Sequence, residues 1–187
     1  MELFKRILEI VDANLIYCLI PMLLIIMFIE GLFKNRFETK KVLNLIRWTI
    51  IIYSIISLIY FLVGTAMHSE DFPITNRAKG AYKTTYWMLL IITLILPFTL
   101  FIKKLGYKYL FVLLVAFCMK IGFYFEHFVI IVTSYHRDYM TESGNAELIY
   151  LFIYGIGIIF LQALVISILV LGIFEIMKRK RNAINKA

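Results

Sequence analysis

Residues 148–177 read LIYLFIYGIGIIFLQALVISILVLGIFEIM, with a single charged side chain, Glu175, near the C-terminal end. A helix needs about 20 mostly apolar residues to cross the hydrocarbon core of a bilayer. The run therefore predicts a transmembrane helix that is longer than spanning requires. Such a helix tilts or continues beyond the bilayer, so this one is expected to carry an end outside the membrane.

Four more apolar runs precede this one, near 14–33, 45–67, 86–102 and 109–135. The whole chain is 62% hydrophobic and 17% charged, with a mean hydropathy of +0.87. A soluble domain of this length does not bury so much apolar surface in one core. The sequence therefore predicts an all-α integral membrane bundle of five transmembrane helices.

Residues 1–12 alternate between apolar and charged side chains at helical spacing, unlike the uniform runs that follow. One face collects apolar residues and the other collects charged ones: Leu3, Phe4, Ile7, Leu8 and Val11 against Glu2, Lys5, Arg6, Glu9 and Asp12. This pattern predicts an amphipathic helix that lies in the membrane interface. No repeat or long linker divides residues 13–187, which are expected to form one transmembrane domain.

The positive charges between the runs predict the orientation of the helices. Lys and Arg number twelve in the first loop, the third loop and the C-terminal tail together, against six in the N-terminal segment and the other two loops. Because cytoplasmic loops carry the excess of positive charge, the N-terminus is expected outside and the C-terminus in the cytoplasm. These topology signals account for the net charge of +8, so the expected contact is lipid and not nucleic acid.

Three charged residues lie near the ends of predicted helices. Glu30 and Glu175 are close to cytoplasmic ends, where they can reach the interface or neighbouring basic side chains such as Lys34, Lys178 and Arg179. We expect both carboxylates to act as interfacial anchors. Arg47, near the start of the second predicted helix, is expected to extend its side chain to the interface in the same way.

Lys120 is different because it lies near the middle of the apolar run 109–135. Helical spacing places it on one face with Tyr124 and His127. A charged side chain at this depth needs a partner from another helix or subunit, and Gln162 offers a hydrogen-bond acceptor. Two interpretations follow: Lys120 belongs to a proton pathway, or it makes a structural pairing.

Glu126 and His127 follow on the same run, about two turns from its outer end. A carboxylate beside an imidazole can accept a proton from a quinol, or the pair can be satisfied within the bundle. The run then ends in polar residues suited to helix capping or to contact with a partner. These are Thr133, Ser134, His136, Arg137 and Asp138. No residue is assigned a catalytic role.

The pattern of Cys and His residues predicts no metal and no cofactor within this chain. Cys18 and Cys118 both lie inside apolar runs and form no C-x-x-C pair. A haem held by two histidines needs both of them inside the membrane, whereas His68 and His136 fall at or beyond the ends of predicted helices.

One segment carries a specific resemblance. Residues 122–138 read GFYFEHFVIIVTSYHRD, which closely resembles the motif GMWFERFVIIVTSLHRD of NrfD-like (polysulfide reductase type) membrane subunits, especially those of alternative complex III. A membrane-embedded Glu, a Thr-Ser pair and a His-Arg-Asp triplet recur in register, which shared hydrophobicity alone would not produce. Upstream positions similar to the family pattern are Asn76, Arg77, Gly80, Tyr82, Tyr86, Trp87, Pro97, Lys103 and Lys104. The resemblance covers about residues 45–140, and more loosely the last helix.

The resemblance implies a fold and a setting. Family members usually have two four-helix bundles, and the similar region is the second bundle, so four of the predicted helices are expected to form an NrfD-like half bundle. Such subunits belong to quinol-oxidising respiratory complexes of the bacterial inner membrane and pass electrons to partners that hold iron–sulfur clusters and haem. Their quinol chemistry is attributed to the first bundle, which this chain does not resemble. A non-catalytic, structural or proton-relaying subunit of an oxidoreductase complex is therefore implied.

The chain departs from the family at three positions. His127 stands where the motif has Arg, Lys120 where Asn is more usual, and Phe98 where Gln is common. At His127 a permanently charged donor has become a titratable one. The matching positions keep a role in proton relay or in helix-end structure: Glu126, His136, Arg137 and Asp138.

Two other functions stay open. The changed polar positions also fit an accessory or assembly membrane protein that keeps the bundle but has no redox role. Lys120 and Glu126 within one predicted helix also fit a small transporter or channel, although no inverted repeat or pair of broken helices accompanies them.

Overall fold

The computed structural model describes residues 2–33, 36–67, 83–122, 124–125, 132 and 142–184, and these residues are almost entirely helical, with no strand among them. Four helical stretches within these ranges are long and apolar enough to cross a bilayer: Leu3–Phe33, Thr39–Met67, Lys83–Phe101 and Tyr154–Ile184. The predicted all-α class is confirmed for this part of the chain. By length and composition these apolar helices are compatible with a multi-pass membrane protein.

The N-terminal segment forms α1 (Glu2–Val11), a π-helical turn η1 (Asp12–Ile16) and α2 (Leu19–Phe33). Tyr17 N donates to Asp12 O at 3.1 Å, which closes the wider turn of η1. The helix predicted over 1–12 is thus present, and it ends where the first predicted span begins. Its location in the membrane interface stays a prediction.

The next two predicted spans lie within α3 (Thr39–Met67) and within α5 (Lys83–Ile95) with the 3₁₀ helix η2 (Leu96–Phe101). Pro97, in the first turn of η2, has no N–H to donate, so the α-helical pattern of α5 cannot continue through it. Ile102 is extended, and a single helical turn, α6 (Lys103–Gly106), leads into α7 (Tyr109–Met119).

The continuous helix predicted over 109–135 is interrupted. α7 ends at Met119, and Lys120 has φ −108° and ψ 6°, outside the helical range. Gly122, two residues further on, weakens helix continuation because glycine loses the most backbone entropy on ordering. After Lys120, the structure describes residues 121–122, 124–125 and 132 of this predicted span, and all of these are helical. The other residues between 121 and 135 lie outside the described residues.

The chain divides into two compact units, 1–46 with 125–187, and 47–124. In the first unit α2 packs along α9 (Glu142–Ile184), a helix of 43 residues that includes the predicted span 148–177. In the second unit η2 contacts α5, α6 and α7. The buried apolar side chains of the two units include Ile16, Leu19, Leu23, Ile26 and Ala163 in the first, and Ile50, Ile51, Leu100, Val112 and Val115 in the second.

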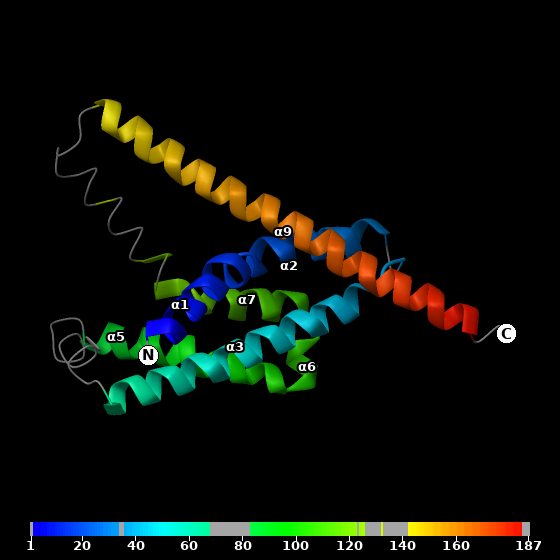
Figure 1. Cartoon of the computed structure of the whole chain (residues 1–187), viewed down its shortest axis with the longest axis horizontal. Coiled ribbons are helices and arrows are strands. Elements are labelled where there is room, and N and C mark those ends of the chain that lie inside the picture. The colour runs from blue at the N-terminus through cyan, green and yellow to red at the C-terminus, as the bar shows by residue number, and fades with distance from the viewer. Residues whose placement is uncertain are drawn as a thin grey trace. The chain divides into compact units, whose positions relative to one another are not determined.

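α2 and α9 run in the same direction along one another (Figure 1). Just before α2 begins, Asn14 O accepts from Gln162 Nε2 at 3.2 Å and Cys18 Sγ donates to Ile159 O at 3.8 Å, and both of these partners lie in the middle of α9. At the C-terminal end of α9, Lys178 Nζ lies 4.0 Å from the carboxylate of Glu38, which follows α2. Contacts at both ends of α2 in this order require a parallel pair.

Candidate functional site

Lys120 lies, partly buried, at the C-terminal end of α7. Its N–H donates to Phe117 O, and its own carbonyl accepts from Tyr124 N, both at 3.0 Å. The second bond has the helical spacing of four residues, which agrees with the prediction that Lys120 and Tyr124 share a face. Because the C-terminal end of a helix carries partial negative charge, this is a favourable position for a cation.

Gln162, the acceptor considered for Lys120, makes its described contacts with the N-terminal segment. Its amide nitrogen donates to the carbonyl of Asn14 at 3.2 Å and lies 3.3 Å from Asn14 Oδ1. The amide of Asn14 in turn donates to Ile10 O at 2.8 Å. This polar chain joins η1 to α9 through hydrogen bonds at exposed positions, which is how amide side chains link neighbouring helices.

Most residues of the family motif are not placed by the structure. Glu126, His127 and the helix-end residues fall outside the described residues: Thr133, Ser134, His136, Arg137 and Asp138. Their roles stay predictions. Phe98, which replaces the family's common Gln, is placed, and its ring stacks on that of Phe101 with 6.3 Å between centroids. An aromatic contact therefore occupies this position.

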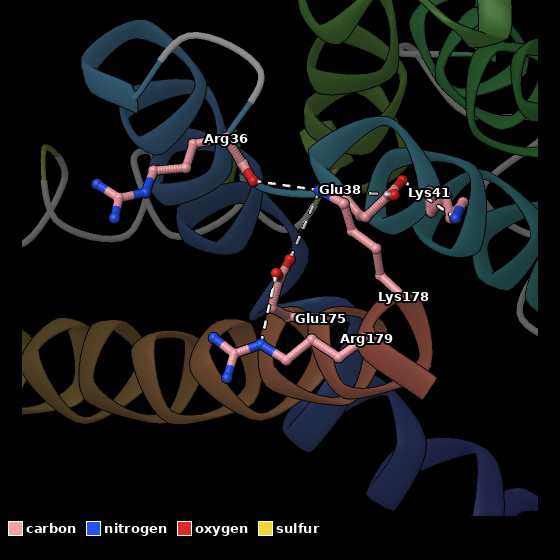
Figure 2. Close-up of polar contacts among 6 residues, drawn as sticks. All are labelled: Arg36, Glu38, Lys41, Glu175, Lys178 and Arg179. Carbon is pink, nitrogen blue, oxygen red and sulfur yellow. Dashed lines mark hydrogen bonds and ion pairs between the residues drawn. The ribbon is translucent and has the colours of Figure 1, made fainter. Parts of the chain in front are cut away.

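An ion-pair cluster joins the loop after α2 to the C-terminal part of α9 (Figure 2). Glu38 lies 3.1 Å from Lys41 and 4.0 Å from Lys178. Glu175 lies 3.9 Å from both Lys178 and Arg179. The predicted pairing of Glu175 with these two bases is confirmed.

Glu38 and Thr39 complete this end of the first unit, and sequence reasoning missed both. The hydroxyl of Thr39, which is 1% exposed at the start of α3, donates to the carboxylate of Glu30. Glu30 therefore has a neutral donor as well as its predicted interfacial position. The signal in the sequence is Glu38, an acidic residue directly before the Thr that begins α3 and next to the basic residues Lys40 and Lys41.

Arg47 does not extend to solvent, so the prediction of a snorkelling side chain is wrong. The residue is 4% exposed, and its guanidinium carbon lies 5.4 Å from the ring centre of Trp48 and 5.2 Å from that of Tyr107. The physical reason is Gly106, whose missing side chain leaves the space that the Arg47 Cδ fills. Aromatic faces attract a guanidinium, which stabilises this position.

The described residues contain no group of three or more His, Cys, Asp and Glu side chains that could hold a metal ion. Cys18 is a buried free thiol bonded to the carbonyl of Ile159, and Cys118 is a partly buried free thiol. The described part of the chain thus offers hydrogen bonding and charge, both at helix ends and within helices.

Comparisons with family models, with curated proteins and with solved structures found no match to this chain. The class that the structure defines is a helical protein with several apolar helices of membrane-spanning length. The NrfD-like resemblance rests on the sequence, on the motif of residues 122–138 and the similar positions upstream of it, and stays a prediction.

Proposed function

We propose that this chain is a multi-pass subunit of a quinol-oxidising respiratory electron-transfer complex in the bacterial inner membrane. Its role is structural or proton-relaying, it holds no cofactor of its own, and its partners are membrane subunits and the subunits that carry haem and iron–sulfur clusters. The observation that carries the proposal is the motif over residues 122–138. Ionisable residues are rare within membrane spans, so an embedded Glu in register with a His-Arg-Asp triplet is a specific signal.

The parallel contact of α2 with α9 supports a five-span topology. Two spans that cross a membrane in the same direction are separated by an odd number of spans. α3 and α5 supply two, and the run 109–135 is the remaining apolar segment between them. In this topology the positive charges place the N-terminus outside and the C-terminus in the cytoplasm.

Five spans put Lys120 at membrane depth, at the point where α7 ends. Interrupted helices occur in membranes only where they are buried in protein or line a water-filled cavity. Both settings suit a group that exchanges protons with Glu126 and His127, which follow it in the sequence. The same position at a helix C-terminus also suits a purely structural cation.

The substitution Lys120→Met in the native complex tests the relay. We expect quinol-dependent electron transfer to fall by at least about tenfold, which is the low end of what a proton-transfer group contributes. The haem content and subunit composition should stay unchanged. Lys83→Met is the matched control, since Lys83 is exposed at the start of α5 and outside the relay. Normal turnover in Lys120→Met complexes would refute the relay.

The accessory or assembly role is favoured by one observation, the aromatic stacking of Phe98 on Phe101 at a position where the family commonly has Gln. Purification of the tagged chain from its native membrane separates the two proposals. A respiratory subunit should arrive with stoichiometric haem absorbance contributed by its partners. Recovery without haem, or loss of complex assembly with normal turnover per assembled complex, would support the accessory role.

A further inference from the structure

We propose that Arg47, together with the exposed lysines of α6 and its flank, binds the phosphate group of an anionic lipid. All the residues involved lie in the unit 47–124, and the site is independent of the proposed respiratory role. The argument rests on a buried cation with unused donors, on the charge of its surroundings and on the aromatic residues beside it.

Arg47 carries hydrogen-bond donors that the described chain does not use. Its Nε and Nη1 atoms are buried and have no hydrogen-bond partner among the described residues. A buried charged donor without an acceptor is costly, and the great majority of buried polar groups in folded proteins are paired. The contacts with Trp48 and Tyr107 stabilise the positive charge but accept no hydrogen bond in the guanidinium plane.

The position of the guanidinium is fixed by the turn that packs on it. A Cβ added to Gly106 would lie 2.4 Å from Arg47 Cδ and 3.3 Å from Arg47 Nε. This turn is itself closed, because Gly106 N and Leu105 N both donate to Ile102 O at 3.0 Å. The donors of Arg47 are therefore held in place next to α6.

The described residues of the unit 47–124 include no acidic side chain. Between residues 47 and 124 the sequence contains two acids, Glu70 and Asp71, and both lie outside the described residues. Meanwhile α6 and its flank present three exposed lysines: Lys103, Lys104 and Lys108. The described residues of this unit therefore offer Arg47 no counter-charge.

In the other unit, the acids whose contacts the structure describes near the ends of α2 and α9 already have partners there. Glu38 and Glu175 pair with lysine and arginine side chains of their own unit, and Glu30 accepts from Thr39. An external anion is therefore the better match for the charge that Arg47 carries.

The neighbouring aromatic residues favour a lipid over a carboxylate from a partner protein. Trp48 is 42% exposed and Tyr107 is 49% exposed, and Trp48 packs edge-on against Phe101. Tyr and Trp side chains concentrate at membrane interfaces, where lipid phosphates lie. Basic pockets beside transmembrane helices bind anionic lipid headgroups, whose phosphate oxygens accept the planar donors of Arg.

Trp48 provides a local reporter, because the chain contains two Trp residues and Trp87→Phe leaves Trp48 alone. The full chain with this substitution is reconstituted into phosphatidylcholine–phosphatidylglycerol vesicles in which one or the other lipid carries brominated acyl chains. We expect bromine on phosphatidylglycerol to quench Trp48 with an apparent preference of about fivefold, the size expected for one charge contact with an anionic lipid.

The preference should disappear in Arg47→Met, become smaller in Arg47→Lys, and fall in the double variant Lys103→Gln with Lys104→Gln. The double variant changes only exposed side chains, so it tests the site even where Arg47→Met fails to fold. Lys83→Gln with Lys180→Gln removes two exposed charges elsewhere and should leave the preference unchanged.

Three results would overturn the proposal. Equal quenching by the two brominated lipids would show that the isolated chain has no such site and would favour a partner's carboxylate. A preference that survives both Arg47→Met and the double lysine variant would place the selectivity elsewhere. Loss of the preference on addition of excess sodium phosphate would assign the site to a free anion and not to a lipid.

Discussion

The substitution Gly106→Ala tests whether α6 and Arg47 pack as closely as the structure places them. The added methyl would lie 2.4 Å from Arg47 Cδ and 2.9 Å from the backbone oxygen of Leu100, both inside the usual contact distance. The Arg side chain can move, but the Leu100 carbonyl belongs to the backbone of η2 and moves only with it. The methyl therefore forces α6 away from η2.

The expected cost follows from two opposing effects. Overpacking a well-filled position typically costs about 1–3 kcal/mol. Replacing Gly by Ala in a helix returns about 0.5–1 kcal/mol through reduced backbone entropy. We therefore expect Gly106→Ala to lower the free energy of unfolding by about 1–2 kcal/mol.

Unfolding in mixed micelles of increasing dodecyl sulfate content, followed by far-ultraviolet circular dichroism, measures this change. Gly172→Ala is the matched control, because a Cβ added at this exposed position of α9 meets nothing within 4 Å. This control should be neutral or slightly stabilising. Equal behaviour of the two variants, or a stabilised Gly106→Ala, would refute the close packing of α6 on Arg47.

The contacts between α2 and α9 lead to three further predictions. In a background without native cysteines, two pairs should each form a disulfide on mild oxidation: Asn14→Cys with Gln162→Cys, and Glu38→Cys with Lys178→Cys. The parallel arrangement is wrong if the mismatched pair Asn14→Cys with Lys178→Cys cross-links as readily. Gln162→Leu and Asn14→Leu should each lower the free energy of unfolding by about 0.5–2 kcal/mol in the same assay. The double variant should lose less than the sum of the two single losses, because the two side chains share one hydrogen bond. Strictly additive losses would contradict the contact. Glu38→Gln should change the free energy of unfolding by no more than about 1 kcal/mol, because the ion pairs of Glu38 are partly exposed. High salt should remove the difference from the wild type. A larger loss that does not depend on salt would show that the carboxylate is buried in the membrane-bound protein.

The helices themselves could be predicted from the sequence, because membrane-spanning length and uniform apolarity are local properties of the chain. The run 148–177 lies within α9, and 45–67 lies within α3. The pairing of Glu175 with Lys178 and Arg179 was also predictable, since residues three and four apart share a helix face. The candidate relay residues were found from the sequence alone as well, and of these the structure places Lys120.

Other features depended on contacts between residues far apart in the sequence. Nothing near Arg47 in the chain indicates that Gly106 leaves room for its side chain and that Tyr107 covers it, so an interfacial arginine was predicted where a buried one is found. The contact of Gln162 with Asn14 was equally absent from any local pattern. The sequence by itself determined which segments are helices, because each helix satisfies its own backbone and meets its own length requirement. Only the tertiary structure decided which charges are buried and where helix pairs meet, because burial depends on the side chains that another part of the chain brings to the same place.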